Sequence, residues 1–428
     1  MKAKLRRYIL TNLIAMTGLS CYLLADTFFI SVAQGANGIT ALNLALPVYG
    51  LMFAIGSMIG VGSATRYSLS KAVGWGDTDR YFSGSVFAAL AASVPFVLLG
   101  LFATDKVLLL LGADSAILAV GHAYLRIALC CAPFFLLNYT FTAFVRNDSA
   151  PTVAMCATLG SGIFNILFDY IFMFPMGMGM VGAALATGIS PMVSMGICLF
   201  HYLSPRNTVR FVWAVPSLRR LAASCSLGVA AFVGEITSAV TTLVFNFLLL
   251  GLGGNVAVAA YGVIANAALV GTALFNGVSQ GLQPLASAAR GSGDRETERW
   301  LLRRSLEVAL VLAALLIAAA LVLAEPLVAA FNSEGSAALA AYAVPGVRLY
   351  FPGFLLAAVN IVRAGYFSAV GMGRESAVIA LSRGVVSILF FAVLLAALWG
   401  ITGVWLAFPA AEAFTLLLGF WMDRRTSA

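Results

Sequence analysis

The sequence predicts an all-α polytopic membrane protein with twelve transmembrane helices in two pseudosymmetric six-helix bundles. Of the 428 residues, 61% are hydrophobic and only 10% are charged, too little charge to cover a soluble protein of this length. The hydrophobic residues form long continuous runs instead of alternating ones, which excludes a β-barrel. The two halves of the chain also share short motifs, which predicts an internal repeat.

Twelve runs are long enough to span a bilayer, because a spanning helix needs about 20 mostly apolar residues. They cover residues 8–33, 39–70, 83–103, 116–146, 150–174, 180–203, 218–250, 255–288, 300–323, 337–369, 375–398 and 401–422. Several runs exceed 25 residues, so we expect tilted helices or helices that extend beyond the bilayer.

Lysine and arginine residues gather in alternate connections between these runs. They cluster at 2–7, 206–220, 290–304 and 424–425, whereas the connections on the opposite side carry none apart from Lys106. Under the positive-inside rule, both termini lie on the cytoplasmic side of a prokaryotic plasma membrane. The net charge of +8 is therefore a topology signal, and we expect no nucleic-acid partner.

The internal repeat is visible in two pairs of runs. The second and eighth runs both end in a Gly-x-Gly-Asp turn, at 74–77 and 291–294. The fifth and eleventh share Ile-Leu-Phe, at 166–168 and 388–390. A six-helix unit that occurs twice keeps its orientation, so the halves are parallel repeats. We expect an N-terminal lobe at 1–203, a cytoplasmic linker at 204–217 and a C-terminal lobe at 218–428.

Two carboxylates, Asp26 and Asp169, lie inside the first and fifth runs. A charge at the bilayer centre costs roughly 2.5–3.5 kcal/mol, so such residues usually face a cavity or a partner. Both lie roughly 27 Å from the cytoplasmic start of their helices, hence at similar depth. The repeat places Phe391 where the first half has Asp169, so this carboxylate belongs to one half only.

Helical periodicity adds polar neighbours to the pair. Tyr22 shares a helix face with Asp26, and Asn165 shares one with Asp169. Thr187 lies at a similar depth in the sixth run. Carboxylate, amide and hydroxyl oxygens suit a small cation such as Na⁺ at Asp26, Asp169, Asn165 and Thr187. The same pair could instead share a proton, or each carboxylate could simply hydrogen-bond a neighbouring helix.

A second polar set lies in the C-terminal half. Its members are Glu235, Asn360, Arg363 and Glu412. A structural Glu–Arg pair and a role in substrate binding are both open for it. The chain has no P-loop motif, and its two histidines lack metal-ligand spacing. We expect no catalytic residues and no cofactor, so transport energy comes from an ion gradient or a partner.

These motifs resemble those of the multidrug and toxic compound extrusion (MATE) family, with the DinF-like branch the most similar. The resemblance spans the chain and rests on the motifs at 24–26, 144–148, 165–169, 180–187 and 281–284. It implies a secondary antiporter that exports cationic or amphiphilic compounds in exchange for H⁺ or Na⁺. Two six-helix lobes would open alternately to either side of the membrane.

By the resemblance, five residues match the N-lobe polar site of the family: Tyr22, Asp26, Asn165, Asp169 and Thr187. Glu235 matches an acidic position in the C-lobe of the NorM branch. That branch also has an aspartate in the tenth helix, where this chain has Asn360 or Val359. A cation site in the C-lobe is therefore not implied.

Three alternatives remain at this point. A lipid-linked oligosaccharide flippase of the same superfamily would line its cavity with arginines, whereas the intramembrane set here is mostly acidic and favours a cationic substrate. An integral membrane enzyme would need a nucleophile–base or histidine-rich set. A channel fits the repeat with one-sided carboxylates less well than alternating access does. We expect a monomer whose partners are the lipid bilayer and small organic, cationic amphiphiles.

Overall fold

The computed structural model describes residues 1–74, 76–113, 115–214, 216–331 and 336–426, and within these ranges every regular element is helical. The helices are α1 (Lys2–Ala72), α2 (Asp79–Phe102), α3 (Thr104–Leu110), α4 (Ser115–Cys130), α5 (Ala132–Asn147), α6 (Pro151–Met173), α7 (Gly179–Tyr202), α8 (Leu218–Gly291), α9 (Arg295–Val322), α10 (Ala324–Phe331), α11 (Ala337–Tyr350), α12 (Gly353–Ala369), α13 (Gly373–Leu381), the π-helical turn η1 (Ser382–Val386) and α14 (Ser387–Thr426). The side chains of Leu24, Arg424 and Arg425, which the sequence analysis used, are not described, although the backbone at these positions lies within the ranges given.

The described ranges contain nine helices long and apolar enough to cross a membrane, or up to eleven if each of two bent pairs counts as one crossing. The longest, Gly373–Met422, has 50 residues and contains Gly400 at φ 59°, where the eleventh and twelfth predicted runs meet. One crossing needs about 20 residues, so this bent helix is long enough for two. Divided at Gly400, the spans reach the predicted twelve, as expected for a polytopic membrane protein.

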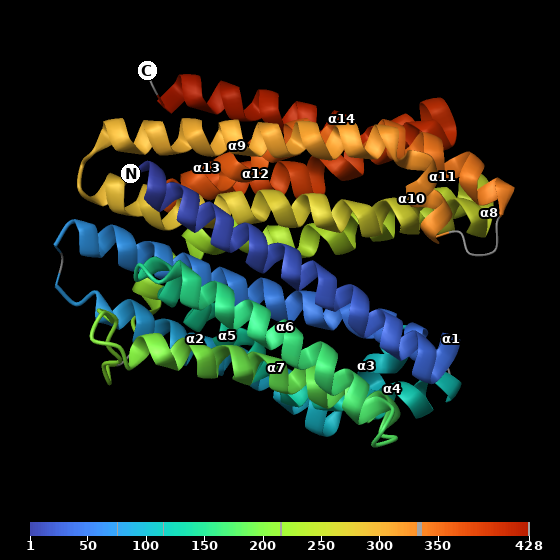
Figure 1. Cartoon of the computed structure of the whole chain (residues 1–428), viewed down its shortest axis with the longest axis horizontal. Coiled ribbons are helices and arrows are strands. Elements are labelled where there is room, and N and C mark those ends of the chain that lie inside the picture. Colours follow the sequence, from blue (N-terminus) through green and yellow to red (C-terminus); the bar gives the residue numbers. More distant parts are fainter. Residues whose placement is uncertain (75, 114, 215, 332–335, 427–428) are drawn as a thin grey trace.

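The longest helical segments, α1 and α8, each correspond to two predicted runs. Figure 1 shows α1 doubling back, so that the spans Lys2–Ile30 and Ala41–Ala72 run in opposite directions. In α8 the break is at Gly254, with φ 66° and ψ −160°. Glycine adopts this left-handed conformation without the steric cost of a Cβ. Gly254 and Gly400 therefore interrupt the helical geometry at the positions where the sequence predicted short connections.

Two predicted helices are broken in the structure. The run 116–146 bends by 45° between α4 and α5, and the run 337–369 bends by 48° between α11 and α12. Proline explains both breaks, because its ring disfavours helical geometry before it and it lacks an N–H donor. Pro133 lies in the first turn of α5, and Pro352 immediately precedes α12. The two bends occupy equivalent positions in the two halves. The long α2 and the short α3 precede the first bend, and the long α9 and the short α10 precede the second.

Buried apolar side chains form separate clusters in the two halves. The largest comprises residues between 245 and 411 together with Leu5, Tyr8 and Ile9 of α1. A second lies between residues 30 and 184. In Figure 1 the blue-to-green helices form one group and the yellow-to-red helices another beside it. The start of α1 packs against the second group and so links the two.

The two groups approach each other closely at several glycines. A Cβ on Gly62 of α1 would overlap the carbonyl oxygen of Ser224, and a Cβ on Gly228 of α8 would overlap that of Met58. A Cβ on Gly277 would lie 2.9 Å from the α1 backbone. Small residues allow helix backbones to approach in this way. Gly62 and Gly228 each lie ten residues, or about 15 Å, from the end of their span.

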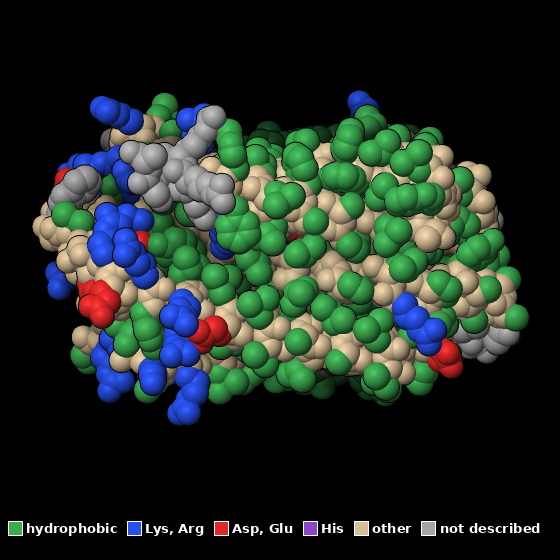
Figure 2. Space-filling view, turned by 90° about the horizontal axis from the view of Figure 1, so that it is seen from above, with side chains coloured by type: hydrophobic (Ala, Val, Ile, Leu, Met, Phe, Trp, Pro, Cys, Tyr) green, Lys and Arg blue, Asp and Glu red, His purple; other side chains and the backbone are tan. Residues whose placement is uncertain are grey.

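The surface is divided between one charged end and a broad apolar region. Figure 2 shows lysine and arginine side chains gathered mainly at one end, with apolar side chains over the rest of that face. Large apolar residues such as Leu110, Phe200 and Phe247 are 88%, 75% and 81% exposed. Exposure on this scale is expected for helices that face lipid. The surface thus agrees with the predicted membrane-spanning fold.

Candidate functional site

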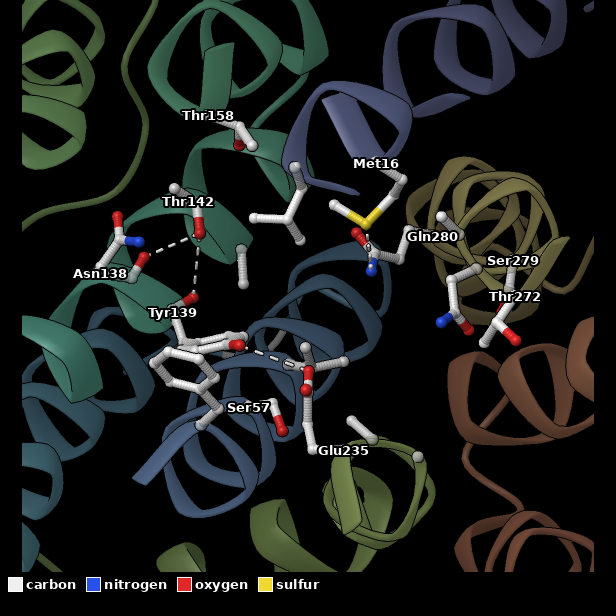
Figure 3. A pocket seen from close by; sticks show the side chains of 18 of the residues that line it. Met16, Ser57, Asn138, Tyr139, Thr142, Thr158, Glu235, Thr272, Ser279 and Gln280 are labelled. Carbon is white, nitrogen blue, oxygen red and sulfur yellow. Dashed lines mark hydrogen bonds between the residues drawn. The ribbon is translucent and has the colours of Figure 1, made fainter. Parts of the chain in front are cut away.

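A cavity of about 350 Å³ lies between the two groups of helices. Its lining residues come from α1, α5, α6 and α7 in the first half and from α8, α12, α13 and η1 in the second. Figure 3 shows Tyr139 and Thr142 of α5 facing Gln280 of α8 across it. The volume is within the range of small-molecule sites.

The cavity wall carries polar atoms that lack partners. Among the described residues, Asn138 Oδ1, Asn165 Oδ1, Ser194 Oγ and Gln280 Oε1 are buried without a hydrogen bond. All four residues line the cavity. Buried polar atoms are normally hydrogen-bonded, so several such atoms around one cavity indicate a surface that is completed by a ligand or by water.

The acid in this wall is Glu235 of α8. The hydroxyl of Tyr139 donates a hydrogen bond to Glu235 Oε1 at 3.3 Å, shown dashed in Figure 3. The bond joins the first half of the chain to the second. Glu235 therefore faces the first half, where Tyr22 lines the same cavity. The sequence analysis had grouped Glu235 with Glu412. In the structure Glu412 is paired with Arg383 and is not among the described residues that line the cavity.

Asp26 and Asp169 meet beside the cavity but are not part of its described lining. Asp26 is 7% exposed and Asp169 is fully buried. The two carboxyl groups lie close enough to share a proton. Within the described residues, no donor reaches Asp26 Oδ1 or either Asp169 oxygen. The structure thus brings the predicted pair together and leaves it without the hydrogen bonds of a purely structural role.

Asn165 and Thr187 extend this acceptor set toward the cavity. Asn165 Nδ2 donates to Thr187 Oγ1 at 3.2 Å, which leaves Asn165 Oδ1 as a further acceptor without a described partner. The ring of Tyr22 packs against Gly162 on the same helix as Asn165. Acceptor oxygens without donors are chemically suited to a proton or a small hard cation. The predicted residues therefore fit either coupling ion.

The second predicted polar set is joined only in part. Glu412 is 1% exposed and accepts from Asn360 Nδ2 at 2.8 Å. Its cationic partner is Arg383, whose Nη2 lies 2.8 Å and whose Nε lies 3.1 Å from Glu412 Oε1. Arg363 instead places its guanidinium over the ring of Phe420, 4.8 Å from the centroid. The Glu–Arg pair thus exists, with a different arginine from the predicted one.

Arg383 was not predicted from the sequence, because its position depends on the π-helical turn Ser382–Val386. The turn places Arg383 at the cavity wall while the side chain reaches Glu412. Hydroxyl groups of Ser387 and Thr415 hydrogen-bond Ser382 within this region. π-Helical turns frequently occur at functional sites, and this one carries a cation to the cavity.

A separate buried acid, Asp148, lies after α5. It accepts hydrogen bonds from His201 Nε2 at 2.9 Å and from the backbone N–H of Thr208 at 2.8 Å, and Lys71 Nζ lies 3.2 Å away. Burial alone would raise the pKa of Asp148, but the bonds from Thr208 and His201 and the charge of Lys71 outweigh burial and lower this pKa. Asp148 therefore ties Thr208 to the first half.

Comparison with known proteins decides the family. The family model described as MatE matches residues 12–171 and 230–411, about 80% of the chain and one stretch in each half. The chain belongs to the MatE family. The matched stretches contain Asp26, Asn165 and Asp169 in the first half and Glu235 in the second. Members of this family are transporters, so the chain is not an integral membrane enzyme.

Relatives and solved structures agree with the MatE assignment. A multidrug export protein MepA of Staphylococcus saprophyticus is 28% identical over 399 residues, covering 92% of this chain and 87% of the relative. A Staphylococcus aureus MepA is 27% identical over 401 residues, with the same coverage.

Among solved structures, an outward-facing multidrug resistance MATE transporter superposes with a TM-score of 0.91 at 21% identity, covering 99% of this chain and 95% of that one. A MOP superfamily transporter from Pyrococcus furiosus, with a binding pocket of reverse polarity, superposes with a TM-score of 0.90 at 20% identity and the same coverage. These likenesses show that the chain has the MATE fold.

Proposed function

We propose that the chain is a secondary antiporter that exports cationic or amphiphilic organic compounds in exchange for H⁺ or Na⁺ by alternating access. One observation carries the coupling part of this proposal: the buried carboxyls of Asp26 and Asp169 face each other beside a cavity without a described hydrogen-bond donor. The names of the MepA relatives, which describe multidrug export, support the substrate class.

In this proposal the ion and the substrate occupy neighbouring sites. The ion binds at Asp26 and Asp169, with oxygen ligands added by Asn165 and Thr187. The positive group of the substrate meets Glu235 in the cavity. Tyr22 lines the cavity and shares a face of α1 with Asp26, so it connects the two sites. An ion drives the cycle only if its affinity differs between the two conformations. In this proposal, two adjacent carboxyl groups that lack hydrogen-bond donors provide that difference in affinity.

The moving parts in this proposal are two lobes, 1–203 and 218–428, joined by a cytoplasmic linker at 204–217. Both termini lie in the cytoplasm, and one copy of the chain suffices for transport. The glycine contacts at Gly62 and Gly228 support a state that is closed near the charged end. Because the cavity is lined by both lobes, a rocking of one lobe against the other changes the side from which it is reached.

A second candidate is the lipid-linked oligosaccharide flippase. The observation in its favour is that Arg146 and Arg383 line the cavity. However, Arg383 is paired with Glu412, and the cavity also contains Glu235. A mixed lining of this kind favours a compound with positive charge over a pyrophosphate, so the antiporter is the better-supported function.

The deciding experiment is transport of the fluorescent cation rhodamine 123 by purified protein in liposomes, with pH and Na⁺ gradients imposed separately and without ATP. We expect dye movement against its gradient when one of the two ion gradients is present. The gradient that works identifies the coupling ion. Strict dependence on ATP, or no transport with either gradient, would contradict the antiporter proposal.

A further inference from the structure

Arg146, near the end of α5, is a buried cation without a described partner. It is 8% exposed and lines the cavity. None of the residues that the structure describes forms a hydrogen bond or ion pair with it, and its Nε atom is enclosed without an acceptor. The other arginine of the cavity wall, Arg383, differs because Glu412 neutralises it.

The surroundings of Arg146 supply no counter-charge. The nearest acid in sequence, Asp148, is taken up by Lys71, His201 and Thr208. On the other side lies Cys198, which belongs to an apolar cluster with Val145. A buried charge without a partner costs several kcal/mol, so such groups are normally paired. A partner that arrives from the cavity would remove this cost.

Ser194 adds a second donor on the same wall. Its hydroxyl is 1% exposed and has no hydrogen-bond partner in the described ranges. It lies one helical turn before Cys198 on α7, so both share the face that Arg146 approaches. A guanidinium and a free hydroxyl are the donor types that bind a carboxylate, and arginine can hold both of its oxygens.

The acidic and basic parts of the cavity lie at a defined spacing. Tyr139, which contacts Glu235, precedes Arg146 by seven residues on α5. Seven residues make nearly two helical turns, so both side chains lie on one face, about 10 Å apart along the axis. A single elongated molecule can therefore reach Glu235 with one end and Arg146 with the other.

We propose that Arg146 and Ser194 form an anion-binding subsite of the cavity, and that the exported compounds include zwitterionic amphiphiles whose carboxylate binds Arg146 while their cationic group binds at Glu235. This inference rests on the proposed export function and adds a substrate class to it. It also explains why a cavity that attracts cations contains an uncompensated arginine.

The test uses two dyes that differ only at the carboxyl group. Rhodamine 110 carries a free carboxylate, and rhodamine 123 is its methyl ester. Binding to purified protein is measured by fluorescence anisotropy, and export is measured in liposomes. We expect Arg146→Gln to weaken rhodamine 110 binding by roughly tenfold or more, the range for a lost hydrogen bond to a charged group, and to change rhodamine 123 binding little. Arg126→Gln, at an exposed arginine of α4 outside the described cavity lining, is the matched control.

Each other outcome has a definite meaning. Equal loss of both dyes, or no loss of either, overturns the subsite. Displacement of rhodamine 110 by phosphatidylglycerol vesicles but not by acetate would assign Arg146 to a lipid phosphate and also overturn it. Rhodamine 110 should raise the melting temperature of the wild type but not of Arg146→Gln, which separates binding from misfolding. If dye binding depends on Arg146 but neither dye is exported, the subsite stands and the export function fails.

Discussion

The hydroxyl of Tyr139 donates a hydrogen bond to the carboxyl of Glu235 across the cavity, with 3.3 Å between the two oxygens. Tyr139 belongs to α5 in the first half of the chain and Glu235 to α8 in the second, as Figure 3 shows. A movement that separates the two halves at this level must break this bond. The bond therefore links the two halves at the position where we propose that the cationic group of the substrate binds.

Glu235→Gln is expected to weaken rhodamine 123 binding by roughly tenfold, because it removes the negative charge that meets the cation. Tyr139→Phe keeps the charge and loses only the donor, so its effect should be smaller. Binding by anisotropy measures both, and the double variant should be less than additive because the residues are in contact. Export should fall only in part; complete loss with Glu235→Gln would place the main coupling at Glu235 instead.

Asp26→Asn and Asp169→Asn are each expected to abolish ion-driven export without loss of folding. Asparagine keeps the size of the side chain but neither titrates nor carries a full charge, so the ion loses its preference for one conformation. Gradient-driven uptake in liposomes measures export, and size-exclusion profiles monitor folding. Wild-type rates in both variants would refute the role, and misfolding would favour a structural one.

Arg383→Met should destabilise the protein by about 3–5 kcal/mol, because it leaves Glu412 as a buried charge without its cation. The double variant Arg383→Met/Glu412→Leu should recover most of that loss, since no buried charge remains. Thermal unfolding in detergent ranks the stability of the wild type, Arg383→Met and the double variant. If the double variant were no more stable than Arg383→Met, the two side chains would not act as a pair.

Asp148 predicts a pH dependence of stability. Its pKa is lower in the folded protein than in the unfolded chain, so its stabilising effect is present at neutral pH and lost as the pH falls through the folded pKa. We expect Asp148→Asn to melt below the wild type at pH 7, with the difference narrowing toward pH 3. A difference that stays constant over this range would show that ionisation of Asp148 does not contribute.

The topology proposal predicts that residue 208 in the linker and the C-terminal residue 428 both lie in the cytoplasm. Fusions of a reporter that is active only in the cytoplasm, made at these two positions, test this directly. Both should be active, because the basic clusters retain these segments on that side. Activity of a periplasmic reporter at either position would exclude an arrangement of twelve spans with both termini inside.

Much of the site could be inferred from helical periodicity and depth. Asp26 and Asp169 were expected to meet because each lies at a similar distance along its helix, and the structure brings them together. Asn165 and Thr187 were expected nearby for the same reason, and they share a hydrogen bond. These inferences need only the rise per residue and the direction of each helix.

Other contacts could not be inferred because they depend on how helices rotate and pack. The hydrogen-bond partner of Tyr139, Glu235, lies almost a hundred residues away on a helix of the other half. The residues around Tyr139 and those around Glu235 show no pattern that predicts this hydrogen bond. Arg383 reaches Glu412 from a π-helical turn, which shifts the periodicity that the inference relies on. The polar face formed by Tyr139, Thr142 and Arg146 was the one available signal for this wall of the cavity.

The close contact of α1 and α8 at Gly62 and Gly228 affects the equilibrium between the two conformations of the protein. Their backbones meet with no space for even one methyl group, so a side chain at either position would act as a wedge. The wedge would raise the free energy of the state seen here and leave a parted state untouched. The size of the residues at positions 62 and 228, neither of which belongs to the described cavity lining, would thus set the resting balance of the cycle, independently of what the cavity holds.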